Sequence, residues 1–417
     1  MAIRVTRQNL VPLPNLGTFF VTGLLFLVAV PVLLWMGRDA LASGMYRHPT
    51  LLAAAHVTIL GWATAIALAA LQQMVPVVFS SELAHPELAR WAGWVYGPGV
   101  AALVSGLATL RPEFLVPGAV LVPAAIFTVL FNVWQTQTAS EGKAARRIRP
   151  FVMSALSYLA FTVLAGVALA FNLATGWLGP RWALVFPAHV TLGLAGWFGM
   201  LVLGISYHLL PFFGLTPKKA DPRWDRLVLV LLHAGIIATW LSTLTPGLSF
   251  LGKAAPAALV AALGLFLWET RALFASRPRE KMHPMVTYVR LSHLYLALLA
   301  GTLLHATGGF AAAQVAWAGV LGLGGWLTNA VLGYLHRILP FYVWHNKYWD
   351  RAAEPGVPTF RDMVAEGPAW VGLALYNAGV IGLLIALPAG LALHGYLGLL
   401  FLGAAVAAAN LLRTYLR

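Results

Sequence analysis

Long apolar runs alternate with short polar connections along most of this chain of 417 residues. A helix needs roughly 20 mostly apolar residues to cross a bilayer, and we find twelve runs of sufficient length. They lie at about 14–37, 51–79, 90–110, 113–138, 151–178, 185–213, 225–247, 249–275, 287–309, 313–343, 367–388 and 392–415. Continuous runs of this length satisfy their backbone in lipid as helices. The pattern therefore predicts an all-α polytopic membrane protein with twelve transmembrane helices.

A Gly-Trp pair recurs three times in this pattern, about 130 residues apart, and a proline follows each pair at the same interval. The three copies are Gly61-Trp62 before Pro76, Gly196-Trp197 before Pro211, and Gly325-Trp326 before Pro340. Gly204 and Gly333 extend the match, because each stands seven residues before its proline. Recurrence at one register predicts related units. We expect one membrane domain (1–417) with pseudo-repeats of four helices at about 14–138, 151–275 and 287–415, the Gly-Trp pairs lying in helices 2, 6 and 10.

The composition supports this class and gives the chain an orientation. Sixty per cent of the residues are hydrophobic and 10% are charged, yet the net charge is +14. The basic residues fall in alternate loops: Arg4 and Arg7; Lys143, Arg146, Arg147 and Arg149; Lys218, Lys219, Arg223 and Arg226; Arg277, Arg279, Lys281 and Arg290. This asymmetry predicts that both termini are cytoplasmic, and it explains the basic charge without a nucleic-acid partner. We expect a multi-pass protein of a prokaryotic inner (plasma) membrane.

The absence of cysteine and of a phosphate-binding loop limits the chemistry that this chain can carry out. The chain has no cysteine, which excludes disulfides, iron–sulfur clusters and covalent attachment of a c-type haem. It also lacks a GxxxxGK[ST] loop, so this chain alone does not drive transport with ATP.

Histidines are the candidate site residues, because a histidine inside a membrane needs a partner, water or a metal. The predicted orientation sorts them into two sets. His56, His189 and His305 lie towards the outer face, whereas His208, His233, His293 and His336 lie towards the inner face. His189 and His208 are nineteen residues apart, or ~28 Å along a helix, so they do not share one centre. Imidazole suits haem iron, copper and zinc, but each ring could equally bond to a neighbouring helix.

Acidic residues are informative by their scarcity. Glu269 is the only carboxylate that we place clearly within a span. Proton pumps and proton-coupled carriers usually need ionisable groups deep in the membrane, so the pattern disfavours both.

Several motifs resemble subunit I of the haem-copper oxidase superfamily, especially its C-family oxidases and the related nitric oxide reductases. "HVTILGW" places His56 five residues before Gly61, and "HVTLGLAGW" places His189 seven before Gly196, like two histidines of that family's Gly-Trp helix. The run 199–211, "GMLVLGISYHLLP", is similar to the family's helix 6. The resemblance implies the twelve-helix fold and haem.

The chain departs from that family at its metal ligands. The segment 241–250, "LSTLTPGLSF", has no His-His pair for the active-site copper, and Ala318 and Val320 stand where the helix 10 haem ligands belong. We therefore do not expect conventional terminal oxidase activity. The segment 48–62, "HPTLLAAAHVTILGW", loosely resembles NnrS, a family of haem membrane proteins linked to nitric oxide stress, although it lacks the Glu-Met of that motif.

These observations favour a protein that binds one or two b-type haems. We expect a haem near the outer face, bound by His56 and His189 or by one of them with His305. Bis-histidine ligation would suit electron transport or redox sensing, and a single ligand would leave iron open to nitric oxide or oxygen. Expected partners are the lipid bilayer, a small electron-donor subunit or cytochrome, and a gas ligand such as nitric oxide.

Two alternatives stay open. One is an oxidoreductase acting on nitric oxide or oxygen at a rearranged haem and metal centre. The other is a transporter or metal-handling protein on the same scaffold, with copper or zinc at the inner histidines.

Overall fold

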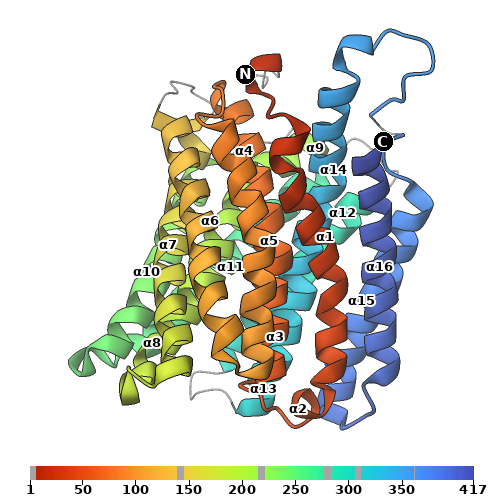
Figure 1. Cartoon of the computed structure of the whole chain (residues 1–417). Helices are drawn as coiled ribbons and strands as arrows, with labels where there is room; N and C mark the ends of the chain where they lie inside the picture. Colours follow the sequence, from red (N-terminus) through yellow and green to blue (C-terminus); the bar gives the residue numbers. More distant parts are fainter. Residues whose placement is uncertain (1–5, 139–144, 215–220, 277–282, 306–310, 361) are drawn as a thin grey trace. The chain divides into compact units, whose positions relative to one another are not determined.

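The computed structural model describes residues 6–138, 145–214, 221–276, 283–305, 311–360 and 362–417. Within these ranges the chain is helical and contains no strand (Figure 1), which confirms the all-α prediction. Its α-helices are α1 (Leu13–Met36), α2 (Arg38–Ala42), α3 (Pro49–His56), α4 (Ala65–Phe79), α5 (Pro86–Thr109), α6 (Pro112–Thr138), α7 (Ala145–Thr175), α8 (Trp182–Thr191), α9 (Met200–Gly214), α10 (Pro222–Leu244), α11 (Leu251–Ala275), α12 (Pro284–His305), α13 (Ala312–Gly319), α14 (Thr328–Lys347), α15 (Glu366–Ala389) and α16 (His394–Leu416).

Eleven helical segments among the described residues are long and apolar enough to cross a membrane. The chain is therefore a multi-pass helical membrane protein. The run predicted at 90–110 forms α5, which is long enough but does not reach the apolarity of the other eleven. That α5 crosses the membrane as a twelfth helix therefore stays a prediction. Orientation also stays a prediction, and seven of the basic residues behind it lie outside the described residues: Arg4, Lys143, Lys218, Lys219, Arg277, Arg279 and Lys281.

The chain forms two compact units. Unit 1 comprises Met1–Gly142, His283–Ser292 and Ala311–Arg417, and unit 2 comprises Lys143–Met282 and His293–Phe310. Unit 1 thus contains the first and third Gly-Trp pairs, and unit 2 contains the second. Helix α12 contributes its first part to unit 1 and the remainder to unit 2.

Unit 1 is organised around α1. This helix packs against α4, α5, α14 and α16, and Figure 1 shows it running beside α5 and α16. Its buried face includes Leu16, Phe19, Phe20, Leu24 and Leu27, which recur at the spacing of one helix face. Burial of this apolar face fixes α1 against its neighbours.

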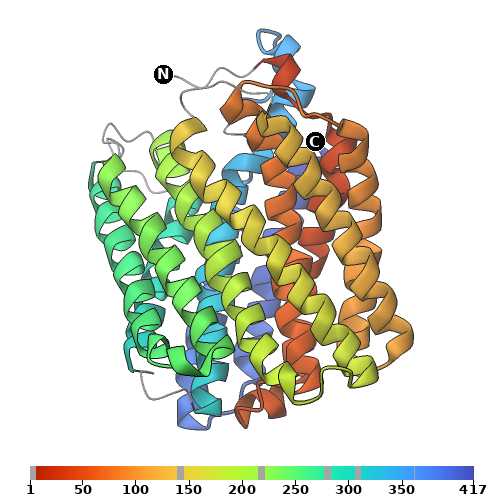
Figure 2. The same cartoon turned by 90° about the vertical axis from the view of Figure 1, so that its left-hand side faces the viewer.

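Unit 2 is organised around α7, which packs against α8, α9 and the segment η4 (Leu192–Gly199). Helices α10 and α11 form an antiparallel pair that packs against α9 (Figure 2). Proline at the first helical position of α10 supports its start, because the missing N–H has no acceptor there anyway.

One glycine in each predicted repeat lets two consecutive helices approach closely. A Cβ on Gly99 of α5 would lie 2.9 Å from Leu121 Cβ of α6, and one on Gly379 of α15 would lie 2.7 Å from the backbone nitrogen of Leu400 in α16. In unit 2, a Cβ on Gly235 of α10 would lie 2.6 Å from Leu259 Cγ of α11. Small residues at such contacts are typical of membrane helix pairs.

Candidate functional site

All three Gly-Trp pairs lie in π-helical segments. These are η2 (Val57–Thr64), η4 and η6 (Val320–Leu327), each between two α-helical parts of one longer helix. The tryptophans Trp62, Trp197 and Trp326 are all buried. A π-helical turn contains an extra residue, is rare, and often lies at functional sites. The recurrence therefore makes these segments candidate positions for a functional site.

Tyrosine hydroxyls bind equivalent carbonyls in two of the segments. Tyr96 of α5 donates to the carbonyl of Leu60 at 2.8 Å, and Tyr376 of α15 donates to the carbonyl of Gly324 at 3.2 Å. Both carbonyls belong to the residue just before a Gly-Trp pair. Both tyrosines also stand three residues before the close-approach glycine of their helix. In α10 of unit 2 the residue at that position is Leu232, which has no hydroxyl to donate.

His56 is the last residue of α3 and directly precedes η2. Its Nδ1 lies 2.8 Å from the carbonyl oxygen of Leu52, one turn earlier. A carbonyl only accepts hydrogen bonds, so Nδ1 carries the proton and Nε2 is the basic nitrogen of the neutral ring. The side chain is half-buried.

His189 lies in α8, shortly before η4. Its Nδ1 lies 3.0 Å from the carbonyl oxygen of Thr162 in α7, so this ring has the same tautomer as His56. Gly166, one turn further along α7, makes room for the ring, because a Cβ there would lie 2.9 Å from His189 Cε1. The third outer candidate, His305, is the exposed last residue of α12. His56 belongs to unit 1, whereas His189 and His305 belong to unit 2.

His233 has both ring nitrogens in hydrogen bonds. Its Nδ1 lies 2.6 Å from the Tyr158 hydroxyl and its Nε2 lies 3.0 Å from the Ser154 hydroxyl. Both partners lie in α7, so this ring joins α10 to α7. A metal could bind His233 only by displacing one of these hydroxyls.

His208 and His293 of unit 2 pack against aromatic rings. His208 stacks on Phe212 at 6.0 Å, and its Nε2 is buried without a hydrogen-bond partner in the described chain. His293 stacks on Phe266 at 5.1 Å and meets the edge of Phe274.

His336 of unit 1 is the most buried of the inner candidates, with 1% of its surface exposed. Its Nδ1 lies 2.7 Å from the carbonyl oxygen of Leu332, so Nδ1 carries the proton. The ring stacks on Tyr288 at 5.2 Å. Neither His336 Nε2 nor the Tyr288 hydroxyl has a hydrogen-bond partner among the described residues. A buried orphan nitrogen of this kind can hold an unseen ligand.

The described part of the chain brings no three histidine or acidic side chains together as metal ligands. A metal site built on one of the inner candidates would therefore need other ligand types or an exogenous ligand besides the described histidine and acidic side chains.

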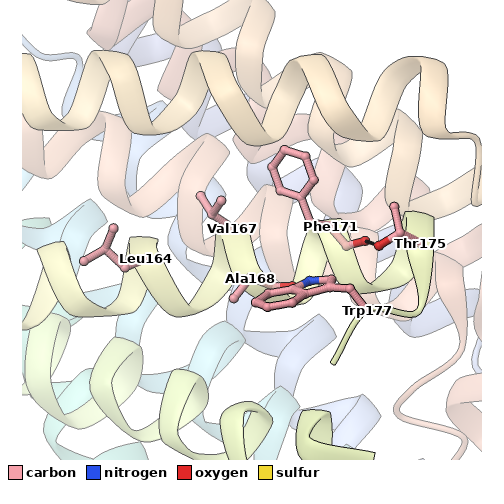
Figure 3. Close-up of a pocket in the computed structure, with 6 residues that line it drawn as sticks. All are labelled: Leu164, Val167, Ala168, Phe171, Thr175 and Trp177. Carbon is pink, nitrogen blue, oxygen red and sulfur yellow. Dashed lines mark hydrogen bonds between the residues drawn. The ribbon is translucent and has the colours of Figure 1, made fainter. Parts of the chain in front are cut away.

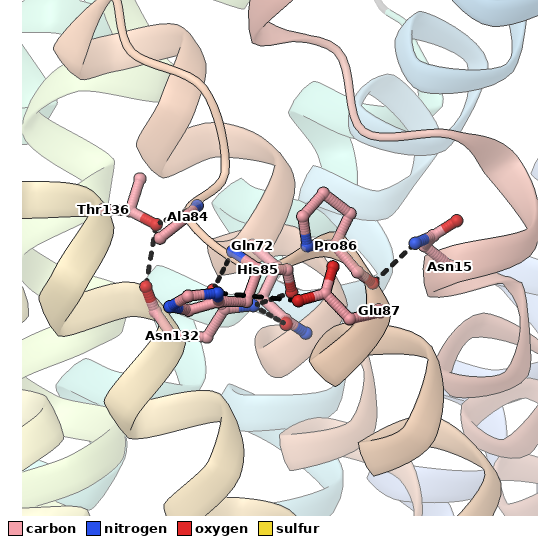
Figure 4. Close-up of polar contacts among 8 residues, drawn as sticks. All are labelled: Asn15, Gln72, Ala84, His85, Pro86, Glu87, Asn132 and Thr136. Carbon is pink, nitrogen blue, oxygen red and sulfur yellow. Dashed lines mark hydrogen bonds and ion pairs between the residues drawn. The ribbon is translucent and has the colours of Figure 1, made fainter.

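Sequence reasoning missed a buried polar cluster in unit 1 that holds the connection between α4 and α5 (Figure 4). Asn132 of α6 binds the backbone of His85 twice: its Oδ1 accepts from the N–H at 2.9 Å, and its Nδ2 donates to the carbonyl at 2.9 Å. Thr136 accepts from the N–H of Ala84, and Gln72 accepts weakly from Asn132 at 3.4 Å. These neutral bonds position a loop.

The apolar hollow in Figure 3 lies along the end of α7 and is distinct from the histidine positions. It is shallow and lined by Leu164, Val167, Ala168, Phe171, Thr175 and Trp177. The Trp177 indole N–H donates back to the carbonyl of Ala168 at 3.2 Å, which folds its ring onto the helix. Its lining offers no ligand for iron, copper or zinc.

Sequence reasoning also overlooked Asp225. This residue begins the apolar run at 225–247, and the structure places it in the first turn of α10 with 2% of its surface exposed. Glu269 is therefore not the only carboxylate inside a membrane-spanning helix.

Comparison with known proteins adds no family assignment. No protein-family model matches the chain, and no characterised protein sequence matches it significantly.

Proposed function

We propose that the chain is a haem-binding membrane protein in which His56 and His189 each supply an axial nitrogen to b-type haem, one or two per chain. The supporting observation is that both rings donate Nδ1–H to a backbone carbonyl, at 2.8 and 3.0 Å. A metal-ligating histidine usually has its other ring nitrogen held in this way, which fixes the tautomer and the ring orientation. The donor chemistry therefore fits haem iron.

Bound haem would supply an iron centre for electron transfer or for a small gas. The chain's own contribution is to hold the two imidazoles neutral and oriented. Exposed His305 is the further candidate for an axial ligand. We infer a role in nitric-oxide-related sensing, protection or electron transport, with a small electron-donor subunit or cytochrome as partner. This role is supported by the haem-copper-oxidase-like motifs around the first two Gly-Trp pairs, which follow His56 and His189. It would be carried out in a prokaryotic inner membrane with both termini cytoplasmic.

The first test is a visible spectrum of the purified full chain from haem-replete cells, oxidised and dithionite-reduced, with a pyridine haemochrome assay and metal quantification. We expect b-type bands without stoichiometric copper. Adding nitric oxide then reports whether the iron has an open position. If the folded protein shows no Soret band, the proposal is wrong.

Two variants test the ligands directly. His56→Gly and His189→Gly should each lower haem content or change the spin state, and added imidazole should restore the spectrum by entering the vacated position. His345→Ala is the matched control, because His345 also bonds a carbonyl one turn earlier, Phe341 at 2.8 Å. That ring is packed among Phe341, Trp344 and Trp349, so we expect normal haem content.

Catalysis is a second candidate at the same centre. An oxidoreductase acting on nitric oxide or oxygen requires one iron with an open position, which the nitric oxide titration measures. A bis-histidine spectrum that nitric oxide leaves unchanged would restrict the function to electron transfer or redox sensing.

Metal handling is a further candidate, favoured by the orphan Nε2 of His336 in its buried site. Copper or zinc bound there should be lost in His336→Ala while haem is retained. His233→Ala serves as the comparison, because its ring nitrogens already bind Tyr158 and Ser154, and its removal should leave the metal content unchanged.

A further inference from the structure

Unit 2 contains a buried charged cluster that the haem proposal does not use. Its members are Arg147 in the first turn of α7, Tyr207 of α9, Asp225 of α10 and Glu269 of α11, and we call it the Arg147 cluster. Within unit 2, α9 packs against α7, α10 and α11, and α10 packs against α11. Tyr207, Asp225 and Glu269 are 5%, 2% and 6% exposed, so the three side chains are almost fully removed from solvent.

Arg147 neutralises one of the two carboxylates. Its Nε donates directly to Asp225 Oδ2 in an ion pair. The guanidinium carbon also lies 5.9 Å from the centre of the Tyr207 ring. A second guanidinium nitrogen, Nη2, is buried and has no hydrogen-bond partner in the described chain.

Among the described residues, Glu269 forms no ion pair with a cation. Its Oε1 accepts a hydrogen bond from the backbone N–H of Asp221 at 2.7 Å, which is a neutral donor. Its Oε2 is buried and has no hydrogen-bond partner among the residues that the structure describes. The Tyr207 hydroxyl lies beside this carboxyl group, yet the two do not form a hydrogen bond of normal geometry.

The charges of the cluster do not balance if every group is ionised. Two carboxylates face one guanidinium, which leaves one negative charge. The ionisable groups that the structure describes around the cluster do not supply a second positive charge. The Asp221 carboxylate caps the N–H of Arg223, Arg271 on α11 is exposed, and His293 of α12 stacks on Phe266. An unpaired carboxylate in such an environment is strongly unfavourable and takes up a proton or another cation.

We propose that the Arg147 cluster is a proton-binding site in which Glu269 holds the proton as a neutral carboxylic acid. Proton uptake converts the carboxylate and a hydronium ion into the carboxylic acid and water, so charge and atoms balance. The orphan atoms Arg147 Nη2, Tyr207 Oη and Glu269 Oε2 supply the two to four polar partners that a buried water molecule needs. The chemistry assigns Glu269 as the proton-binding group, Arg147 as the fixed counter-charge of Asp225, and Tyr207 as a positioning residue. This site is independent of the proposed haem ligands.

Infrared difference spectroscopy of the full chain at neutral pH tests the assignment. We expect a carboxylic-acid C=O band that shifts in D₂O and disappears in Glu269→Gln. Glu113→Gln is the matched control, because Glu113 is an exposed carboxylate in the first turn of α6, and it should leave the band unchanged. A wild-type spectrum without this band, or a band that survives in folded Glu269→Gln, would overturn the proposal.

Two further measurements keep the test decisive. Tyr207→Phe should retain the band but move its frequency, because the acid loses its polar neighbour; an unchanged frequency would contradict the geometry. Titration with sodium, potassium and calcium salts separates the proton from a metal ion. We expect no change in the band, whereas its loss on adding one of these cations would show that Glu269 binds that ion instead.

Discussion

The two units bury different kinds of polar group. The buried polar side chains described in unit 1 are all amides, hydroxyls or an imidazole, including Gln72, Asn132, Asn329, Asn377 and His336. Unit 2 instead buries two carboxylates, Asp225 and Glu269. Neutral amides are satisfied by nearby backbone and by each other, as when Asn377 donates to Asn329 at 2.9 Å. A buried carboxylate needs a cation or a proton. The described buried polar groups of unit 1 are therefore amides, hydroxyls and one imidazole, whereas unit 2 also buries two carboxylates.

The π-helical segments show the same contrast. In unit 1, tyrosine hydroxyls bind the carbonyl before each Gly-Trp pair. In unit 2, Leu232 takes the tyrosine position, and the next residue, His233, binds two hydroxyls of α7 instead. The same backbone segment thus accepts a tyrosine hydrogen bond in unit 1, and the neighbouring helix in unit 2 offers no tyrosine at that position.

The strongest test of this contrast is Asp225→Asn. This change removes the counter-charge of Arg147 and leaves a partly buried guanidinium without its partner. We expect a loss of about 3 kcal/mol in unfolding free energy. Glu269→Gln is the matched comparison in the same cluster. Because glutamine resembles the neutral acid, its effect should stay below about 1 kcal/mol. Thermal unfolding in detergent measures both, and equal losses would contradict the different charge states that we assign.

A second test compares the close helix contacts of the two units. Gly379→Ala in unit 1 should destabilise by about 2 kcal/mol, because the new Cβ meets the backbone of α16, which cannot move aside. Gly235→Ala in unit 2 should have a smaller effect, since the nearest atoms belong to the flexible Leu259 side chain. Gly264→Ala, which meets nothing within 4 Å, is the control. Denaturation curves of the three variants should rank in this order.

A third test removes one neutral bond of unit 1. Tyr96→Phe leaves the carbonyl of Leu60 without its donor and should lower unfolding free energy by about 1 kcal/mol. Tyr348→Phe provides the control, because Tyr348 donates to the carbonyl of Arg417 at 2.9 Å in an exposed position where water can replace it. If both substitutions had the same effect, burial of the Tyr96 bond would have no special role.

The smallest expected effect concerns an exposed acid outside the membrane spans. Hydrogen bonds from the Thr359 hydroxyl and backbone N–H lower the pKa of Asp362 below its ordinary value. A lowered pKa in the folded state contributes stability above the unfolded pKa, and this contribution is lost as the pH falls through the folded pKa. Asp362→Asn should therefore flatten the acid limb of the stability curve slightly. An acid limb identical to that of the wild type would show that these bonds do not persist in solution.

Helix positions were predictable because length and apolarity decide them. The predicted run 14–37 corresponds to Leu13–Met36, and 392–415 corresponds to His394–Leu416. The three Gly-Trp pairs, which the sequence singled out, lie in π-helical segments. Their π-helical geometry did not follow from the sequence, since it depends on which neighbouring groups receive the displaced carbonyls. Asp225 was missed because an acid at the start of an apolar run resembles an interfacial residue until its partner Arg147, 78 residues away, is placed.

For the histidines too, the sequence predicts local features but not contacts that depend on tertiary packing. Their presence in spans was evident from the sequence, and the local bonds of His56 and His336 to carbonyls one turn earlier follow from helix geometry. The bond between His189 and Thr162 and the two hydroxyls around His233 required the packing of α7. Haem binding, metal binding and orientation remain predictions.

The three π-helical segments also set the phase of the long helices that contain them. Each residue of an α-helix advances the direction of its side chain by about 100°, so one additional residue in a turn rotates everything beyond it by that angle. His56 and Pro76 lie on opposite sides of η2 and therefore point in directions that an unbroken α-helix would not give them. Deleting one residue of η2, such as Ile59, would restore the regular period and turn the whole second half of the helix. Each segment thus acts as a built-in angular offset between the two α-helical halves that it joins, and at least one of those halves carries a histidine candidate.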